Sequence, residues 1–557
     1  MHLLRGYNFI QCKQCKHRMK MVINLKKLPI GIQTFRKIIE GGYIYADKTQ
    51  FIYKLIQNAS SVFLSRPRRF GKSLLLDTMA EMFGGDKELF KGLWIYDTDY
   101  AFKKHPVIRI DFSCMDTENP EELKESIISR LEFYFTVYGL VSCTNNPVAK
   151  FEELIWKLKD KYGERVVVLV DEYDKPVLDH ITDFKTADAN RQVIKRFFGI
   201  LKGMDAYLRF TFFTGVSKFT KTSLFSELNN LSDITMAEDY VNICGFTNND
   251  INALFDDHIT EIKKLPKFAS LPETGEGSLL DNIYKWYDGY SWDGENRVFN
   301  PFSLLNFMDK KEILSYWFTS GSPGFLVKLM KQNPDLYLSL DSSTTNEIIL
   351  DAMDIDKISP VSLMFQTGYL TVRSIKRQED NFPIYELKIP NDEVRVSFNQ
   401  YILAGFTETE ISSSWNSQQK MLSALKDGEP EKLEGILCGL FASIPYEIHV
   451  DTEAYYQSLF YCVMQLIGFN ISAEVSTSHG RADGILELPR TVYVMEFKYK
   501  KGEETDEALH ETAAKAMEQI NQRGYANRYS GSAKEVIKIA VGVVGRSGVR
   551  VIFERGL

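Results

Sequence analysis

Residues Ser61 to Met79, which read SVFLSRPRRFGKSLLLDTM, decide the fold of this chain. The apolar run Val62-Phe63-Leu64 predicts a short buried strand. A polar loop follows and ends in Gly71-Lys72-Ser73, where a leucine-rich helix begins. A helix that starts at such a loop directs backbone N–H groups and the positive end of its dipole toward an anion. We therefore predict a phosphate-binding loop between a strand and a helix.

The loop residues have distinct expected roles. Lys72 is expected to reach the β- and γ-phosphates of ATP, and the Ser73 hydroxyl to bind Mg²⁺. The usual pattern has a glycine five residues before the Gly-Lys-Ser, and here that position holds Arg66. The motif alone also fits a helix N-terminus with a solvated lysine. The other residues assigned to nucleotide binding in this loop are Arg69, Phe70 and Gly71.

Composition limits the class of protein. With 557 residues the chain is too long for one core, and 44% hydrophobic with 25% charged residues is typical of soluble globular domains. A net charge of −7 means that a nucleic-acid partner would have to be bound by a local groove. No apolar run approaches the ~20 residues of a membrane span, and the seven scattered cysteines suit a reducing cytosol. We expect a cytoplasmic protein without a membrane partner.

The N-terminal residues 1–21 read as a basic extension, and either Met1 or Met21 fits as the true start. Cys12-x-x-Cys15-x-His17 has a metal-like spacing. No second pair of ligands lies nearby to complete four, so we expect no structural zinc there.

A second acidic motif follows the run Arg165–Val170 (RVVVLV), which is typical of a central parallel strand. Asp171 and Glu172 come directly after it, at the strand end where open α/β sheets bind ligands. We expect Asp171 to hold Mg²⁺ and Glu172 to polarise the attacking water. A helix N-cap with acidic first-turn residues is the alternative.

Strands and helices alternate through this region, which predicts an α/β fold with a parallel, doubly wound sheet. Thr214 or Ser217 sits where a polar residue would sense the γ-phosphate, although a plain strand-end turn fits equally well. The expected strands are 106–112 and 208–214, and the expected helices are 121–137, 151–161 and 190–202.

Four stretches carry a family resemblance: Arg66–Ser73 (RPRRFGKS), Leu169–Val177 (LVDEYDKPV), Thr214–Phe219 (TGVSKF) and Phe225–Thr235 (FSELNNLSDIT). Together they resemble the AAA-ATPase-like family of bacterial and archaeal proteins. Arg-Arg-Phe before Gly-Lys-Ser is that family's own form of the loop. The resemblance implies a P-loop ATPase fold, nucleotide binding and a nuclease-like domain at the C-terminus, but no particular rate of hydrolysis.

The middle of the chain, from 248 to 425, shows mostly helical patterns. Its aromatic run Tyr284–Trp292, with Arg297 nearby, fits base stacking or core packing against a neighbouring domain. Residues Ser362–Pro390 read as two strands of a hairpin or winged element. The expected domains are the extension 1–21, the ATPase 22–247, a helical lid and linker 248–430, and a small α/β nuclease-like domain 431–557.

A second constellation lies near the C-terminus. Glu496 and Lys498 are two apart on the predicted strand Thr491–Tyr499, so their side chains share a face. Asp483 is expected on the preceding strand and would converge on the same point. Two such carboxylates bind Mg²⁺ or Mn²⁺, which activates water, and the lysine orients that water or neutralises charge. An ordinary strand with a polar face is the alternative.

This Asp…Glu-x-Lys arrangement resembles the core of the PD-(D/E)XK phosphodiesterase superfamily, over residues 453–525. The resemblance implies that Glu453 is an additional metal-binding acid on a helix. It also implies that Gln519, as a catalytic residue, and Tyr525 belong to a trailing motif that lines the site. Ala482 replaces the proline of the usual Pro-Asp signature.

Together the two sites predict an ATPase coupled to a metal-dependent nuclease, with ATP and Mg²⁺ or Mn²⁺ as cofactors and DNA favoured over RNA. The alternatives are a nucleotide-dependent switch or scaffold with a non-catalytic nuclease-like domain, and a nuclease whose phosphate loop is structural. In a homo-oligomer Arg68 and Arg69 would stabilise charge across a subunit interface; a buried structural role is the other expectation for both.

Overall fold

The computed structural model describes residues 25–218 and 231–320 without interruption. The remaining described residues are 326–327, 330, 336, 340, 343–351, 353–354, 357–377, 382–407, 420–421, 423–444, 452–466, 475–477, 480–487, 491–524 and 534–555. The Cys-x-x-Cys-x-His spacing at residues 12–17 and Tyr525 therefore lie outside the described residues.

The N-terminal part is built on a five-stranded sheet in the order β2-β3-β4-β1-β5, and every neighbouring pair in it is parallel. β4 lies between β1, which leads into the Gly-Lys-Ser loop, and β3, which ends at Asp171. This sheet confirms the predicted α/β fold. The strands are β1 Ser61–Ser65, β2 Val107–Asp111, β3 Val166–Asp171, β4 Leu208–Gly215 and β5 Leu231–Asp233.

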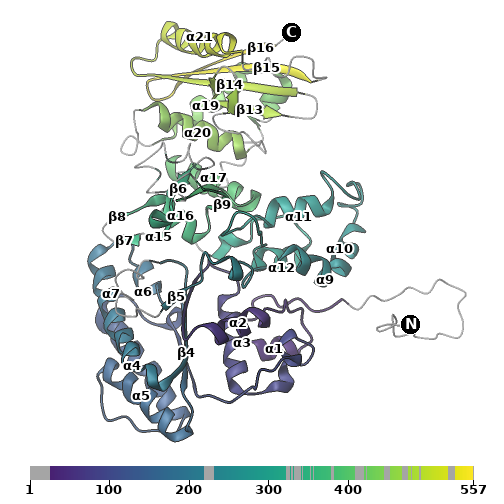
Figure 1. Cartoon of the computed structure of the whole chain (residues 1–557). Helices are drawn as coiled ribbons and strands as arrows, with labels where there is room; N and C mark the ends of the chain where they lie inside the picture. Colours follow the sequence, from purple (N-terminus) through teal and green to yellow (C-terminus); the bar gives the residue numbers. More distant parts are fainter. Residues whose placement is uncertain are drawn as a thin grey trace, which may run out of the picture.

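Helices cover both faces of this sheet because alternate strand residues point to opposite sides. Val62 and Leu64 enter the core shared with α3, whereas Phe63 enters the core shared with α4, α5 and α7. Figure 1 shows α1 to α3 on one side of β4 and α4, α5 and α7 on the other. The helices are α1 Phe35–Glu40, α2 Thr49–Asn58, α3 Lys72–Gly84, α4 Pro120–Val137, α5 Pro147–Tyr162, α6 Lys175–Leu178 and α7 Phe184–Gly199.

Local sequence sets where the helices on the outer face begin. Asn119 and Asn146 are the N-caps of α4 and α5, and each side chain accepts hydrogen bonds from two backbone N–H groups of the first turn. A proline follows each cap, at the position where its missing N–H costs nothing. The helices predicted over 121–137 and 151–161 are thereby confirmed, and α4 starts one residue earlier and α5 four residues earlier than predicted.

The middle of the chain is mainly helical and packs against the Gly-Lys-Ser loop that follows β1. Ser362–Thr367 was predicted to be part of a strand, and that prediction is wrong: these residues belong to α16, which Ser359 caps and Gly368 ends with φ +92°. Its elements are α9 Asn248–Leu254, α10 Asp256–Lys263, α11 Leu279–Tyr287, α12 Pro301–Lys310, η7 Trp317–Ser320, β6 Thr344–Thr345, α15 Glu347–Asp351, β7 Met353–Asp354, β8 Lys357–Ile358, α16 Pro360–Thr367, β9 Thr371–Arg377, β10 Pro383–Lys388 and α17 Asp392–Thr407.

The C-terminal part holds a mixed sheet in the order β13-β14-β15-β16, in which only β14 and β15 are parallel. The parallel pair is joined through α21, which lies so close that a Cβ on Gly542 would be 2.4 Å from Ala513 N. In Figure 1, α21 lies on one face of this sheet and α19 and α20 on the other. The elements are α19 Pro430–Ala442, α20 Glu453–Leu466, β11 Val475–Thr477, β12 Gly480–Ala482, β13 Gly484–Glu487, β14 Thr491–Lys500, α21 Asp506–Gln522, β15 Glu535–Val544 and β16 Gly548–Arg555.

The part of the chain that the structure describes holds no helix with the length and apolar character needed to cross a membrane.

A buried arginine fixes the start of the Gly-Lys-Ser loop. Arg66 is 0% exposed, and its guanidinium donates hydrogen bonds to the carbonyl oxygens of Ser65, Thr235 and Tyr240. Its Cζ lies 3.8 Å from the ring centroid of Trp292. Burial lowers the pKa of Arg66 to about 10, so the group stays charged at neutral pH. The loop is therefore anchored by a cation where a glycine was expected.

We predict that Arg66→Met lowers the free energy of unfolding by about 3–5 kcal/mol, because it leaves three buried carbonyl acceptors without their donor. The neighbouring Arg68→Met is the matched control: its side chain is exposed, and we expect a change within about 0.5 kcal/mol. Urea unfolding followed by tryptophan fluorescence measures both. Equal effects of the two substitutions would contradict the anchoring role of Arg66.

Candidate functional site

The Gly-Lys-Ser loop joins the end of β1 to the start of α3. Gly71 has φ +87°, a conformation that side chains with a Cβ rarely adopt, and it ends the loop just before the first helical residue, Lys72. No heavy atom lies within 4 Å of where a Cβ on Gly71 would be, so the backbone conformation alone requires glycine. The strand, loop and helix predicted around this motif are confirmed.

Lys72 is held by the loop itself. Its Nζ donates to the carbonyl oxygens of Arg66 at 2.9 Å and Pro67 at 3.0 Å, and the residue is 5% exposed. Burial lowers the pKa of Lys72, and the nearby carboxylates of Asp171 and Glu172 oppose that shift. The ammonium group is thus already desolvated at the N-terminus of α3. Its attraction for an anion that reaches it is stronger there than in water.

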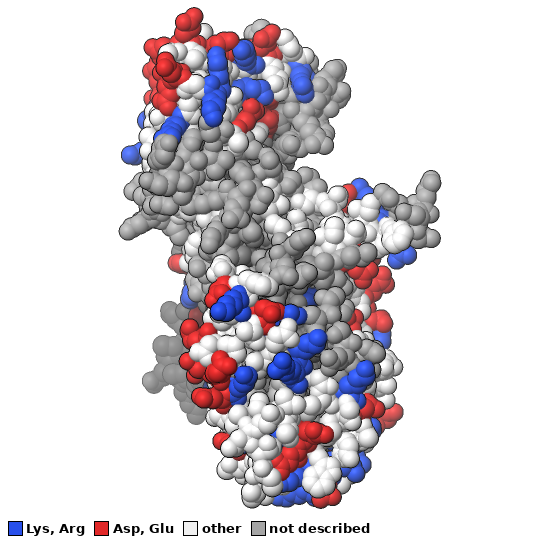
Figure 2. Space-filling view, turned by 90° about the vertical axis from the view of Figure 1, so that its left-hand side faces the viewer, with Lys and Arg blue, Asp and Glu red and all other residues white. Residues whose placement is uncertain are grey.

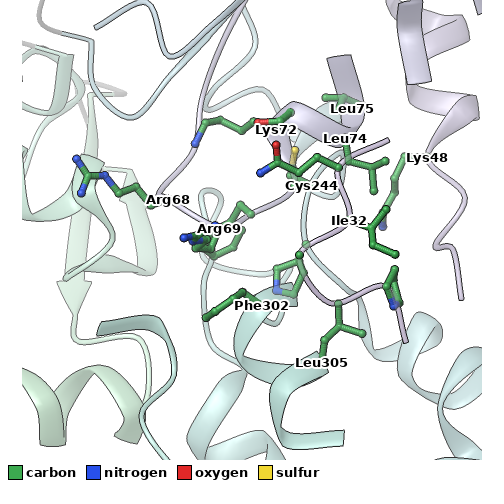
Figure 3. Close-up of a pocket in the computed structure, with 18 of the residues that line it drawn as sticks. Ile32, Lys48, Arg68, Arg69, Lys72, Leu74, Leu75, Cys244, Phe302 and Leu305 are labelled. Atoms are coloured by element: carbon green, nitrogen blue, oxygen red, sulfur yellow. The ribbon is translucent and has the colours of Figure 1, made fainter. Parts of the chain in front are cut away.

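A cavity of about 520 Å³ opens beside this loop. Figure 3 shows Lys72 and Cys244 at one end and the apolar side chains of Ile32, Phe302 and Leu305 along it. Ser73 and Glu172 also line the cavity. A pocket with apolar walls and a few polar groups at one end is the usual form of a small-molecule site.

The two exposed arginines of the loop behave differently from Arg66. The guanidinium Cζ of Arg69 lies 5.0 Å from the ring centroid of Phe302, and the residue has φ +70°. Arg68 extends away from Arg69 in Figure 3 and lines the cavity edge. Both side chains are exposed, so neither has the buried structural role that was one expectation for them. Arg66 is the buried arginine of the loop. Phe70, by contrast, is 1% exposed and packs against Tyr290 at 4.8 Å between ring centroids.

The carboxylates after β3 face two directions. Asp171 is buried, accepts a hydrogen bond from Thr214 Oγ1 at 2.5 Å, and is not among the residues that line the cavity. Glu172 has φ +48°, and burial raises the pKa of its carboxyl group while Lys72 opposes the shift. Neither residue caps α6, which begins at Lys175. Of these two residues, Glu172 lines the cavity and Asp171 does not.

Asp174 is a cavity residue that sequence reasoning missed. Its Oδ2 accepts hydrogen bonds from Ser217 N at 2.6 Å and Ser217 Oγ at 2.7 Å, which fixes the chain just after β4. Ser217 thus faces Asp174, and Thr214 faces Asp171. The spacing Asp-Glu-x-Asp after the predicted strand could have indicated Asp174, because a buried carboxylate near the end of a strand needs hydrogen-bond donors.

The C-terminal acidic residues come together as a second cluster. Asp483 lies at the bend between β12 and β13 and not within a strand, which corrects the prediction. Its backbone N–H is 3.4 Å from Glu496 Oε2, and its Oδ2 accepts a hydrogen bond from Phe497 N at 2.8 Å. Lys498 Nζ lies 3.6 Å from Glu496 Oε1, so these two side chains share a face of β14 as predicted.

Two helices contribute the rest of the cluster. Gln519 on α21 donates from Nε2 to Glu496 Oε1. Glu453 on α20 places Oε1 3.7 Å from Lys498 Nζ. Gln457, one helical turn after Glu453, hydrogen-bonds to Asp483 and was not predicted. Its position four residues after Glu453, on the same helix face, was the available signal.

The electrostatics of this cluster are those of crowded carboxylates. Burial and, to a smaller extent, the neighbouring Asp483 raise the pKa of Glu496 to about 7, although Lys498 opposes the shift. Burial also raises the pKa of Asp483, although the Phe497 N–H and Lys498 oppose it. Both groups would lose this unfavourable energy on binding a cation.

The donor set of the cluster fits a hard divalent cation through Asp483 and Glu496, whose carboxylates lie close enough for Asp483 to raise the pKa of Glu496. Among the residues that the structure describes, no group of three or more His, Cys, Asp and Glu has the geometry of a metal centre. Glu453 is paired with Lys498 instead. A cation here would therefore have two carboxylate ligands and complete its shell with water.

The parallel sheet with its Gly-Lys-Ser loop and the mixed sheet with its acidic cluster define an α/β protein that joins a P-loop NTPase-type domain to a small nuclease-type domain. A family model described as "Predicted AAA-ATPase" matches residues 29–225, and the model of the PD-(D/E)XK nuclease superfamily matches residues 451–553.

A full-length relative supports the same assignment. The "Uncharacterized protein in vnfD 5'region" of Azotobacter chroococcum mcd 1 is 38% identical over 522 residues, which span 93% of this chain and 96% of the relative. The chain belongs to the AAA-ATPase-like family whose members carry a C-terminal PD-(D/E)XK nuclease-superfamily domain.

The face drawn in Figure 2 carries charged side chains of both signs. There, Lys and Arg side chains alternate with Asp and Glu side chains over both ends of the molecule. Among the described residues on this face, no broad basic field is visible. A nucleic acid bound on this face would meet charges of both signs, so binding would depend on local contacts.

We predict that, in EDTA, the free energy of unfolding of the C-terminal domain falls by roughly 1–3 kcal/mol as pH rises from 5 to 8. The pKa of Glu496 is about 7 in the folded state against an ordinary value of 4.5, so the folded state binds the extra proton between these values. Glu496→Gln should flatten the slope, and Mg²⁺ should raise stability at pH 8. Urea unfolding of the wild type and of Glu496→Gln at several pH values measures this dependence of stability on pH. The same dependence in both proteins would rule out the raised pKa of Glu496.

Proposed function

We propose that this chain binds ATP in the cavity beside Gly71–Ser73 and cleaves phosphodiester bonds of nucleic acid, DNA in preference to RNA, at the Asp483–Lys498 cluster. The observation that carries the proposal is the convergence of Asp483, Glu496, Lys498 and Gln519 from three separate segments on one buried point. An ordinary strand with a polar face would leave Glu496 in contact with water, whereas its side chain is 0% exposed.

The N-terminal cavity suits a nucleoside triphosphate with Mg²⁺. Lys72 would exchange its two carbonyl partners for phosphate oxygens, and the N–H groups at the start of α3 would face the same anion. Ser73 lines the cavity and would bind the cation, together with Asp171. Glu172 would accept a proton from an attacking water, a role that its raised pKa favours.

At the C-terminal cluster Asp483 and Glu496 would hold Mg²⁺ or Mn²⁺, with Glu453 near them. A cation bound there supplies a water of lowered pKa and stabilises charge on the scissile phosphate. Lys498 is 31% exposed at its side chain, so it can face both solvent and a bound phosphate. Gln519 would keep the Glu496 carboxylate oriented through its hydrogen bond.

We further propose that ATP controls cleavage and that the protein acts in the cytoplasm, in keeping with the five free cysteines among the described residues. In a homo-oligomer the exposed Arg68 and Arg69 would be available to a neighbouring subunit's nucleotide. The alternative, a switch with a non-catalytic nuclease-like domain, would bind ATP and leave nucleic acid intact.

We expect Lys498→Ala to lower cleavage of labelled DNA by about 100-fold or more with Mg²⁺ or Mn²⁺, because the cluster loses the positive charge beside Glu453 and Glu496. Lys500→Ala is the matched control, since Lys500 lies on the same strand and pairs with Glu511 away from the cluster. Gel-based cleavage of DNA and RNA, with and without ATP, measures both.

Two further variants separate the candidate functions in the same assay. Glu496→Ala should abolish cleavage and leave ATP binding intact, whereas Lys72→Ala should weaken ATP binding and remove the effect of ATP on cleavage. Equal cleavage by the Lys498→Ala and Lys500→Ala proteins would contradict the assigned cluster. Tight ATP binding with no cleavage of any substrate would favour the switch.

A further inference from the structure

We infer that helix α17 couples the nucleotide loop to the nuclease cluster, so that ATP binding changes the position of α20 and with it Glu453. The inference rests on the proposed function and specifies how one site regulates the other. α17 spans Asp392–Thr407, about 24 Å at the usual rise per residue. Figure 1 places it between the middle of the chain and α20.

The nucleotide loop touches the middle of the chain at several points, and two of these lead to α17. Trp317 Nε1 donates a hydrogen bond to the carbonyl oxygen of Arg68 at 3.2 Å. The backbone at Gly368 lies against the loop, since a Cβ there would be 2.7 Å from Pro67 Cβ. Movement of residues 66–68 therefore displaces Trp317 or the turn after α16, because packed interiors have no free space to absorb it.

Both contact points continue directly to the N-terminal half of α17. Glu393 Oε1 accepts hydrogen bonds from Tyr316 N at 2.6 Å and Trp317 N at 2.8 Å. The ring of Tyr369, next to Gly368, contacts Phe398 on α17 with 5.7 Å between centroids. The buried Glu393 carboxylate fixes the segment that carries Trp317 to the first turn of the helix.

The other end of α17 meets the nuclease domain. Phe406 packs against Tyr455 on α20 with ring centroids 5.2 Å apart, and both are 0% exposed. Tyr455 is two residues after Glu453, whose carboxylate pairs with Lys498. α20 also contacts β14 through Phe460 and Phe497, at 5.7 Å between ring centroids. A shift of α20 would therefore alter the cluster from two directions.

Nucleotide binding supplies a reason for the loop to move. Lys72 Nζ is bonded to the carbonyl oxygens of Arg66 and Pro67, which directly precede the carbonyl that Trp317 holds. Phosphate oxygens would compete for this ammonium and release those carbonyls, so the backbone at Pro67 and Arg68 would rearrange. The same buried core contains Trp317, Phe398, Phe406, Tyr455 and Phe497, so the path is continuous.

Hydrogen exchange with the full chain tests the inference. In the wild type, the ATP analogue AMP-PNP with Mg²⁺ should change amide exchange in residues 453–466 by about fivefold or more. Trp317→Phe removes the hydrogen bond to Arg68 and part of the packing against Tyr369, and Phe406→Leu removes the ring contact with Tyr455. We expect either variant to bind AMP-PNP with an affinity within about threefold of the wild type. In either variant AMP-PNP should change the exchange rates of residues 453–466 by less than about twofold.

Phe197→Leu is the matched control for Phe406→Leu, because Phe197 is also fully buried but lies in the core on the opposite face of the sheet. It should lose similar stability and keep the full response. An unchanged response in both path variants, or no response in a wild type that binds AMP-PNP, would overturn the inference. A wild type that binds no AMP-PNP would refute the proposed nucleotide site, and the inference with it; a separate binding titration identifies this case.

Discussion

The structure depends on one buried cation, the guanidinium of Arg66. It joins the end of β1 to the carbonyl oxygens of Thr235 and Tyr240 and stacks on Trp292, so two distant segments are fixed to the start of the Gly-Lys-Ser loop. A buried guanidinium tolerates few geometries, because each of its donors needs an acceptor. This constraint explains why the loop can lack the first glycine of the usual motif and still hold Gly71 and Lys72 at the N-terminus of α3.

The same anchoring brings the middle of the chain against the Gly-Lys-Ser loop. The aromatic run 284–292, for which base stacking and core packing were both open, places Tyr290 against Phe70 and Trp292 against Arg66. The core that contains these rings extends through α17 to Tyr455 and Phe497 in the nuclease domain. Two domains with independent sheets therefore share one continuous hydrophobic core, which is unlike the small polar interface expected between freely moving domains.

Sequence patterns predicted what local physics determines. The β-branched run before Asp171 and the spacing of Glu496 and Lys498 gave the right strands and the right shared face, because both depend only on neighbouring residues. The patterns failed where long-range packing decides. Ser362–Thr367 is apolar enough for a strand, but the cap at Ser359 and Gly368 makes it a helix. The burial of Arg66, the role of Asp174 and the pairing of Glu453 with Lys498 all depend on partners more than 40 residues away.

The central claim is that one chain carries two separate ligand sites, a nucleotide loop and a cation-binding acidic cluster. The most direct test is a crystal structure with AMP-PNP and Mn²⁺, in which anomalous scattering locates each manganese ion. The account predicts phosphate density on Gly71–Ser73 and an anomalous peak between Asp483 and Glu496. Phosphate density at the loop without manganese at the cluster would contradict the proposed nuclease site. Manganese at the cluster without nucleotide at the loop would contradict the proposed nucleotide site.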